Sequence, residues 1–575
     1  MFISGSLEFA GQYCMIDKEG GKENRLNQRK LGIFLSYLNI TLQSLLGFLY
    51  IPILLHYIGK SEYGLYQLMG SLIAYFGIMD FGLSAAVIRF YAKYLALKDR
   101  VGMENILAIA LRCYGVVMGV MLIAGGVVYT MLDAAFSDSM TAGEVAEAKD
   151  IFLLLLLNIV ITLSTMVFRS VINAHERFLF LKGMETVQLV LQPMLVVLLL
   201  MHHPSAFSVA LVQTGLNLVL SFARVYYCFV RLHVRIRYHY WSHELMVSFR
   251  RLALSVFAVT LIDQVFWKTN QIILGVISGT AAVAVYSTAS IIYMGYMQLS
   301  VAISGVYLPH VMTMVAEKAT SEKLSALFIQ IGRWQYYLLA LVATGFILFG
   351  ERFIRLWAGE GFEEAYGITL LIILPFTIDL IQNVGLAILQ AENRYDFRAK
   401  VYFVTGLFNL ALAIPLGMAY GGTGCAFATG LSMFLGNGLV MNWFYAKEIH
   451  LAIASFWQQI GRISLTVFAC LMAGLGLVSL PGSQGIGRFL VEIGLYTFFY
   501  SVCIYLFAMN DGEREKVHGI CGRTRMGRRV VLYLDRGEES MMRLNISKRL
   551  EIRGGYSRSK LLIKKFLRHR DSSRK

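Results

Sequence analysis

The stretch YGLYQLMGSLIAYFGIMDFGLSAAVIRFYAK, Tyr63 to Lys93, is apolar over most of its length and basic at its end. A helix of about 20 apolar residues crosses the hydrocarbon core of a bilayer, so this stretch is long enough to span one. Its only carboxylate, Asp80, and the arginine that follows, Arg89, both lie near the end. The stretch therefore predicts a membrane-spanning helix that carries its charge at one end.

Similar apolar stretches recur through the 575-residue chain, from Leu31 to Met509. The chain is 57% hydrophobic and 15% charged, whereas soluble domains are about 45–50% apolar and about 25% charged. Its seven prolines suit long helices, and its 52 glycines suit close packing of helices in lipid. We expect an all-α polytopic membrane protein with about 14 transmembrane helices.

The basic residues of the loops alternate in phase with the predicted helices. The most basic loop, RLHVRIRYHYWSHELMVSFRR (residues 231–251), follows the sixth predicted span, and the acidic loop LDAAFSDSMTAGEVAEAKD (residues 132–150) follows the third. Cytoplasmic loops carry the excess of Lys and Arg. We therefore predict a multi-pass protein of the bacterial plasma (inner) membrane with both termini in the cytoplasm.

The C-terminal segment is also strongly basic. Residues 511–575 contain 19 Lys and Arg against 8 Asp and Glu. One interpretation is a solvated cytoplasmic tail, and the other is that LLIKKFLRHR (residues 561–570) lies on the anionic headgroups of the inner leaflet. Because no nucleic-acid-binding fold or aromatic platform accompanies this charge, we expect no nucleic-acid partner.

Two pairs of short segments repeat in the same order. IGKSEYGLY (58–66) resembles SGTAAVAVY (278–286) at an offset of 220 residues, and NAHERFLF (173–180) resembles QAENRYDF (390–397) at an offset of 217. Parallel repeats of this kind occur among secondary transporters, with the substrate site at the repeat interface. The predicted organisation is a cytoplasmic N-terminal segment (1–30), two pseudo-symmetric six-helix halves (31–232 and 233–445), two additional helices (446–509) and a basic cytoplasmic tail (510–575).

The N-terminal region resembles a known family. The residues that carry the resemblance are Gly59, Tyr63, Gly64, Tyr66, Asp80, Gly82, Leu83 and Arg89. They look like the signature of bacterial polysaccharide flippases of the Wzx type, which export O-antigen and teichoic acid. These flippases belong to the multidrug/oligosaccharidyl-lipid/polysaccharide exporter superfamily. The resemblance implies a transporter that flips a polyprenyl-pyrophosphate-linked oligosaccharide across the membrane, by alternating access, for cell-surface polysaccharide synthesis, with polysaccharide assembly proteins as further partners.

Charged residues inside membrane spans are costly and point to functional sites. Arg112 and Lys268 are the cations expected to attract the phosphates of the substrate, although either could instead pair with a carboxylate. Asp263 and Asp379 are candidates for coupling to an ion, or for structural ion pairs. The seventh predicted span also supplies the polar and aromatic residues expected to contact the substrate, namely Gln264, Trp267, Asn270 and Gln271.

A third group of charges lies near the predicted cytoplasmic surface. Asp80 is about 26 Å along its helix from Tyr63, at 1.5 Å per residue, and together with Gly82 it can form a helix break or a tight contact at the inner rim. Arg89 sits at the edge of the following loop, and Arg169, in the fourth predicted span, lies at a depth similar to that of Asp80. We expect these three residues to form a cytoplasmic gate or a structural pairing at the helix ends.

Two other functions share some of these features. A cation-coupled multidrug antiporter of the same superfamily would have the same duplicated helices, but with a smaller and more acidic cavity. A polysaccharide polymerase or ligase is an enzyme and would need a larger outside loop carrying catalytic residues. The sequence lacks the phosphate-binding pattern GxxxxGK[ST], and its seven cysteines are scattered. We therefore predict a transporter without catalytic residues, metal or cofactor.

Overall fold

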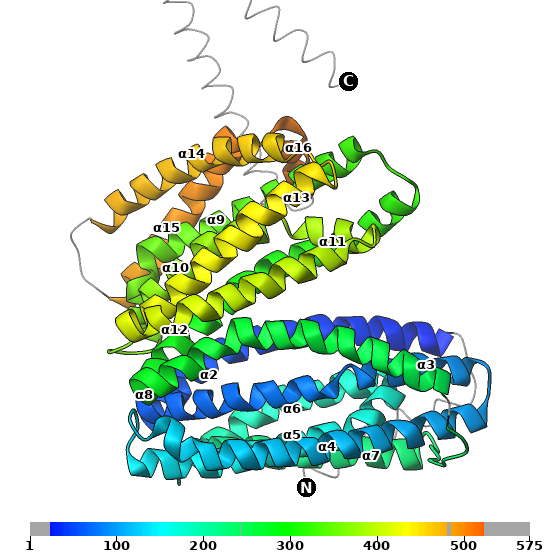
Figure 1. The fold of residues 1–575 in the computed structure, drawn as a ribbon. Coiled ribbons are helices and arrows are strands. Elements are labelled where there is room, and N and C mark those ends of the chain that lie inside the picture. Colours follow the sequence, from blue (N-terminus) through cyan, green and yellow to red (C-terminus); the bar gives the residue numbers. More distant parts are fainter. Residues whose placement is uncertain (1–22, 242, 480–484, 522–575) are drawn as a thin grey trace, which may run out of the picture. The chain divides into compact units, whose positions relative to one another are not determined.

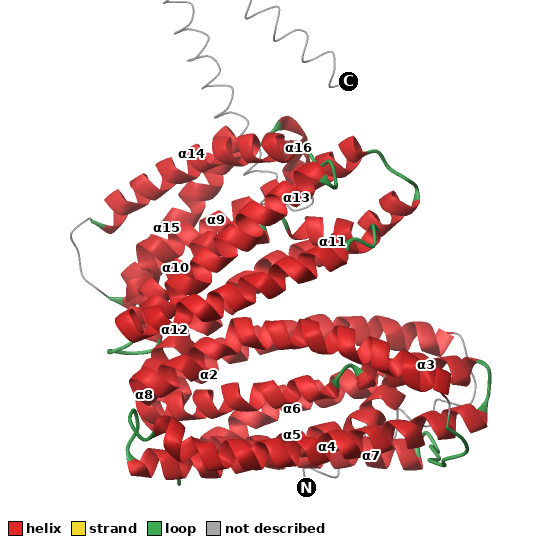
Figure 2. Ribbon diagram, viewed as in Figure 1, coloured by secondary structure: helices red, strands yellow, loops and turns green. Residues whose placement is uncertain are grey.

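The computed structural model describes residues 23–241, 243–479 and 485–521, and its regular elements in these ranges are all helical (Figure 1 and Figure 2). The prediction of an all-α protein is confirmed. The longer helices are α2 (Glu23–Phe76), α3 (Leu83–Ala96), α4 (Arg100–Phe136), α5 (Ala142–Ala174), α6 (Phe178–Leu200), α7 (Ala206–Val230), α8 (His243–Ala316), α9 (Ser321–Trp357), α10 (Glu364–Leu380), α11 (Asn383–Ala391), α12 (Tyr395–Met433), α13 (Met441–Lys447), α14 (Ile453–Val478), α15 (Ile486–Cys503) and α16 (Asp511–Cys521). The short elements are η2 (Gly77–Asp80), η3 (Phe434–Val440) and η4 (Ile504–Ala508).

Ten of the described helices are long and apolar enough to cross a membrane, or eleven if the bent pair α10–α11 counts as one span. A polytopic membrane protein is therefore confirmed. Three of the ten are 53 to 59 residues long, roughly 80–90 Å at 1.5 Å per residue. Each of these three contains a glycine with positive φ, namely Gly59, Gly279 or Gly421. The count of fourteen spans requires each of them to cross twice, and it stays a prediction.

The first pair of repeated segments has the same backbone geometry in both copies. Gly59 has φ 74° and ψ −178°, and Gly279 has φ 78° and ψ −173°. A residue with a Cβ rarely adopts such a φ, which explains why both copies carry glycine where one helical stretch turns into the next. Gly64 has a different role, since an added Cβ would lie 1.9 Å from the Thr280 carbonyl oxygen. That glycine allows α2 and α8 to approach closely.

The second pair of repeated segments, 173–180 and 390–397, also has matching backbone conformation and aromatic packing. Glu176 and Asn393 occupy matching positions with φ of 58° and 56°. Phe180 stacks on Tyr227 with ring centroids 4.0 Å apart, and Phe397 stacks on Phe444 at 3.9 Å. The partner is 47 residues further along the chain in both cases. The repeat read from short motifs therefore extends to backbone conformation and to aromatic packing.

The chain separates into two compact units. The first contains described residues 23–335 and 350–451, and so most of both predicted halves. The second combines residues 336–349 with described residues from 452 onward, including α14, α15 and α16. In this second unit, Tyr496 donates a hydrogen bond to Thr344 Oγ1 at 2.7 Å, and Tyr337 donates one to Glu513 at 3.0 Å. The boundaries predicted at residues 30, 232, 445 and 509 stay predictions, and LLIKKFLRHR lies outside the described residues.

Candidate functional site

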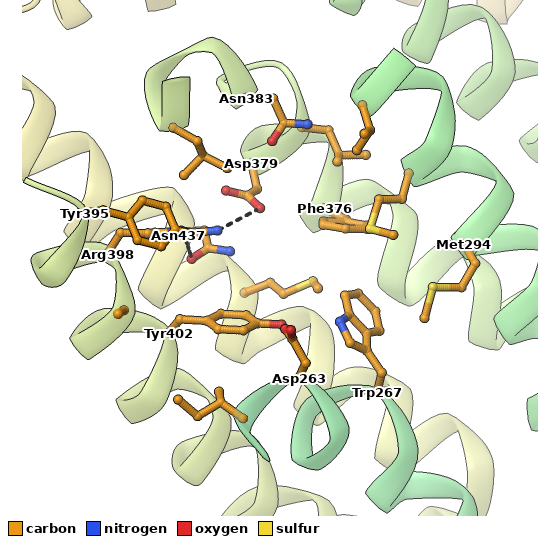
Figure 3. Close-up of a pocket in the computed structure, with 17 residues that line it drawn as sticks. Asp263, Trp267, Met294, Phe376, Asp379, Asn383, Tyr395, Arg398, Tyr402 and Asn437 are labelled. Carbon is orange, nitrogen blue, oxygen red and sulfur yellow. Dashed lines mark hydrogen bonds and ion pairs between the residues drawn. The ribbon is translucent and has the colours of Figure 1, made fainter. Parts of the chain in front are cut away.

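The first unit contains a partly open cavity of about 450 Å³ within the predicted second half (Figure 3). Its walls come from α8, α10, α11, the start of α12 and η3. The lining combines carboxylates, a guanidinium, amides, aromatic rings and methionines. Its polar and aromatic members include Asp263, Trp267, Phe376, Asp379, Asn383, Tyr395, Arg398, Tyr402 and Asn437.

Arg398, in the first turns of α12, is the cation of this cavity. Its side chain is buried, with 8% of the residue exposed. One guanidinium nitrogen, Nη1, donates a hydrogen bond to the Asn437 side-chain oxygen, and Nη2 lies 3.6 Å from Asp379 Oδ2 (Figure 3). A buried charge persists only when it is paired and hydrogen-bonded. Asp379 and Asn437 together meet that requirement from two different helical segments.

Tyr402 connects Arg398 to the second carboxylate. The guanidinium carbon of Arg398 lies 5.6 Å from the centroid of the Tyr402 ring. The Tyr402 hydroxyl lies beside the Asp263 side chain (Figure 3). Two carboxylates and one guanidinium therefore face the cavity, linked through one phenol, and their formal charges sum to −1 when both carboxylates are ionised.

An aromatic wall faces these charges. The Trp267 ring is stacked on Tyr293 at 5.7 Å between centroids, and it makes a tilted contact with Phe376 at 5.6 Å. Met294 and Met297 contribute flexible apolar surface beside these rings. The cavity therefore presents a polar side and an aromatic side, which suits a ligand that is itself amphiphilic.

The structure brings together three of the residues singled out from the sequence. Asp263, Trp267 and Asp379 all line this cavity. Gln264 and Gln271 lie on another side of α8, where the Tyr75 hydroxyl donates to the Gln264 backbone oxygen at 3.3 Å. Gln271 accepts a hydrogen bond from Ser71 and donates one to Ser287 at 3.0 Å.

Asn270 and Lys268 also lie outside the cavity lining. The Asn270 amide donates to Tyr286 at 2.7 Å and to Thr429 at 2.8 Å, and the residue is 2% exposed. These contacts give Asn270 a role in holding helices together. Lys268 is half-buried on α8, directly after Trp267. Substrate binding by Lys268, Gln264, Asn270 and Gln271 stays a prediction.

Arg112 is on the surface of α4. It is exposed, and its guanidinium carbon lies 3.9 Å from the centroid of the Tyr238 ring. Tyr238 belongs to the basic segment that joins α7 to α8. Arg112 therefore contacts this segment rather than the cavity, and its predicted attraction for substrate phosphates stays untested.

The three residues predicted to form a gate have separate neighbours. Asp80 accepts hydrogen bonds from Tyr114 at 2.5 Å and from Ser84 at 2.8 Å. It precedes a break between α2 and α3, where Phe81 and Gly82 have φ of 48° and 66°. The helix break expected at this point is therefore present, with Asp80 as its hydrogen-bond anchor.

Arg169 and Arg89 lie elsewhere on the helix surfaces. Arg169 pairs with Glu185 of α6 at 2.9 Å, and Arg89 is an exposed residue of α3. Each of the three predicted gate residues thus makes its own local contacts, and the gate itself stays a prediction.

Arg398, Tyr402 and Asn437 are the site residues that sequence reasoning missed. Arg394, Arg398 and Lys400 fall together between two predicted spans, so the positive-inside rule assigns all three to a cytoplasmic loop. The structure instead begins α12 at Tyr395, so that Arg398 turns inward. The repeat contained the missing signal: at the offset of 217, Arg398 matches Leu181, which is a buried position.

The comparisons with known proteins agree with this architecture. Residues 31–315 match the family described as "Polysaccharide biosynthesis protein". The chain belongs to this family. This match confirms the resemblance to the polysaccharide branch of the exporter superfamily. A separate comparison with curated proteins found no match to the sequence.

Two solved structures share the fold of this family member. One is "Lipid II flippase MurJ, inward closed conformation", with 15% identity, a TM-score of 0.65, and coverage of 83% of this chain and 98% of that chain. The other is an inward-facing multidrug resistance MATE family transporter of the MOP superfamily, with 14% identity, a TM-score of 0.55, and coverage of 72% and 96%. At these identities the similarity establishes the fold of a polytopic transporter.

Proposed function

We propose that this polysaccharide biosynthesis protein flips a polyprenyl-pyrophosphate-linked oligosaccharide from the cytoplasmic to the outer leaflet of the plasma membrane. The family match and the transporter fold support movement of a glycan precursor rather than its synthesis. The observation that carries the proposal is the cavity in which a buried guanidinium faces aromatic rings and amides. It matches a headgroup made of phosphates and sugars.

Arg398 is the proposed phosphate ligand. A guanidinium has five N–H donors, of which the contacts with Asn437 and Asp379 use two. The distance of 3.6 Å to Asp379 exceeds the roughly 2.7–2.9 Å of a tight charged hydrogen bond. An entering phosphate can therefore replace Asp379 as the anionic partner, while Asn437 continues to orient the guanidinium.

The opposite side of the cavity suits sugar rings. Trp267 and Phe376 offer apolar ring faces for the C–H groups of a pyranose. Asn383 and, beside Arg398, Asn437 carry amides, which both donate and accept hydrogen bonds and so complement sugar hydroxyls. In this scheme the polyprenyl chain stays in the bilayer, and only the headgroup enters the protein.

The remaining sequence predictions extend this proposal. Asp263 and Asp379 are proposed to couple transport to an ion by changing their protonation or their pairing with Arg398. The break at Asp80, together with Arg89 and Arg169, is proposed to close the cytoplasmic side during alternating access. Polysaccharide assembly proteins are the proposed partners that deliver or receive the glycan.

A second candidate function is a cation-coupled multidrug antiporter. The observation that favours it is the pair of carboxylates, Asp263 and Asp379, in one aromatic cavity. An organic cation could pair with a carboxylate and stack on Trp267. Arg398 opposes this function because it already supplies a cation at Asp379.

The test is flipping by purified protein in liposomes that contain a fluorescent polyprenyl-pyrophosphate oligosaccharide. Accessibility of the fluorophore to a membrane-impermeant quencher reports its movement between leaflets. Arg398→Gln should slow protein-dependent flipping about tenfold or more, because hydrogen bonds to charged groups contribute about 1.5–3 kcal/mol. Arg394→Gln is the matched control, since Arg394 lies one turn earlier and pairs with Glu448 outside the cavity.

Three results separate the candidates. Flipping that Arg398→Gln slows and Arg394→Gln preserves supports the proposed function and site. Flipping that neither substitution affects keeps the function and rejects Arg398 as the ligand. Absence of flipping together with proton- or sodium-driven efflux of a cationic dye would favour the antiporter. Lys268→Ala and Arg112→Ala belong in the same assay, because both cations stay predicted ligands.

A further inference from the structure

The basic segment between α7 and α8 has a definite structure that the proposed transport cycle leaves unexplained. Residues 231–241, here called the linker, form neither helix nor strand, and they begin with a turn in which His233 has a φ of 51°. Val234 is buried, and its neighbours two residues away, Leu232 and Ile236, are half-buried. The alternate positions point outward and are basic: Arg231, His233, Arg235 and Arg237. One face of the segment is therefore packed against the protein, and the basic face is exposed.

The end of the linker is fastened to α4. The Asn105 side chain is 1% exposed and donates to the Tyr240 carbonyl oxygen at 2.9 Å. Its own oxygen accepts hydrogen bonds from the backbone N–H groups of His239 at 2.9 Å and Tyr240 at 3.2 Å. The His239 ring also lies 2.9 Å from a Glu104 carboxylate oxygen. These contacts hold the linker in place. A loop whose only role was to carry positive charge on the cytoplasmic side would not need such contacts.

Arg112 fixes the linker at a third point. Its guanidinium covers the Tyr238 ring at 3.9 Å. A cation over an aromatic face is attracted by the ring quadrupole. This contact explains an arginine that is exposed on a membrane helix and lies outside the cavity.

The length of α4 indicates the depth at which these contacts lie. Its 37 residues span about 55 Å, whereas the hydrocarbon core is about 30 Å thick. If α4 is centred, about eight residues project at each end. Asn105 then lies outside the hydrocarbon and Arg112 about 5 Å inside it. The linker residues that contact them lie at the level of the lipid headgroups.

The exposed side chains of the linker suit that level. Tyr238, Tyr240 and Trp241 are 43%, 44% and 55% exposed, and tyrosine and tryptophan favour the membrane–water interface. Three outward-facing arginines lie in the same segment and complement anionic phosphates. We propose that the linker is a binding surface for the anionic headgroups of phospholipids in the cytoplasmic leaflet. Charge and interfacial aromatic residues, fixed on one ordered segment, are the features that carry this proposal.

The test measures quenching of Trp241 fluorescence in nanodiscs by lipids with brominated acyl chains. The difference between the protein and Trp241→Phe isolates Trp241 from the other five tryptophans. Brominated phosphatidylglycerol should quench Trp241 about threefold more effectively than brominated phosphatidylcholine at low salt, because each basic residue near the surface attracts anionic lipid. Arg231→Gln, Arg235→Gln and Arg237→Gln together should abolish this preference.

A second triple variant controls for net charge. Lys318 and Lys323 follow the eighth predicted span and Lys400 follows the tenth, in loops that the positive-inside rule assigns to the cytoplasm. All three are exposed, so changing them to Gln removes the same charge elsewhere. The preference should survive in that variant. Equal quenching by the two lipids in the unmodified protein would overturn the proposal. So would equal loss of preference in both triple variants, or a Trp241 that only a water-soluble quencher reaches.

Discussion

The two predicted halves of the chain share local backbone turns and aromatic packing, and they differ in the residues that they bury. Both turn at a glycine of positive φ, and both carry the same stacked aromatic pair 47 residues apart. The second half contains the cavity with Arg398, Asp379 and Asn437. At the offset of 217, the corresponding residues of the first half are Leu181, Thr162 and Leu220. Both leucines are buried.

This difference indicates how a duplicated module acquires a site. The three positions hold two leucines and a threonine in the first half, and an arginine, an asparagine and an aspartate in the second. The local backbone differs as well: Asn437 lies in η3 and Asp379 lies just before the 42° bend between α10 and α11, whereas Leu220 and Thr162 lie inside α7 and α5. The buried guanidinium is tolerated because the other two changes supply its partners. We therefore expect Asp379, Arg398 and Asn437 to contribute to the stability of the fold as one unit.

The largest effect is expected when the second-half cation alone is placed in the first half. Leu181→Arg puts a guanidinium at a position that is 6% exposed. Without Asp and Asn at positions 162 and 220, we expect loss of folded protein, because an uncompensated buried charge costs about 3–5 kcal/mol. Fluorescence-detected size-exclusion chromatography gives the folded yield. A normal yield would show that this part of the first half can solvate a charge.

A large effect is also expected when the pairing in the second half is broken from one side. Arg398→Leu leaves Asp379 without its cation and should lower the unfolding temperature in detergent. The triple change Asp379→Thr, Arg398→Leu and Asn437→Leu gives the second half the residue types that the first half has at the matching positions. It should unfold near the temperature of the unmodified protein, since replacing a whole buried ionic set is often neutral, yet flip substrate about tenfold more slowly or worse. Equal instability of both variants would contradict a unit of three residues.

A moderate and matched effect is expected at the aromatic stacks. Phe180→Leu and Phe397→Leu each remove one ring from a stacked pair, which contributes about 0.5–1.5 kcal/mol beyond burial. The two variants should lower the unfolding temperature by similar amounts. A loss confined to one half would show that the stacks have diverged in function despite their common geometry.

The smallest effects concern pH at the repeated loop. Burial and the neighbouring Arg177 lower the pKa of His175, while burial raises the pKa of the matching Glu392 against the opposing effect of Arg394. His175 therefore reduces stability as pH falls below its ordinary pKa, and Glu392 reduces it as pH rises above its ordinary pKa. His175→Gln should weaken the first dependence and Glu392→Gln the second, in unfolding temperatures measured from pH 4 to 8. Unchanged profiles would show that solvent screens both groups.

The sequence was sufficient for the fold but for only part of the site. Apolar stretches predicted the helices because hydropathy leaves a local signal, and the first repeated motif marked the two places where Gly59 and Gly279 turn the chain. Asp263, Trp267 and Asp379 were found because polar residues within apolar helices are conspicuous. Arg398 was missed because it lies beside Arg394 and Lys400 at a helix start, where a basic residue is normally solvated. Only its register with buried Leu181 distinguishes it.

The central claim is that the cavity around Arg398 binds the pyrophosphate headgroup. It is tested most directly by titrating purified protein with a short-chain polyprenyl-pyrophosphate disaccharide while recording the fluorescence of Trp267, with Trp267→Phe as the blank. The account predicts a saturable change that Arg398→Gln weakens about tenfold or more and that Arg394→Gln leaves intact. An equal affinity in Arg398→Gln, or no Trp267 response while flipping persists, would contradict it.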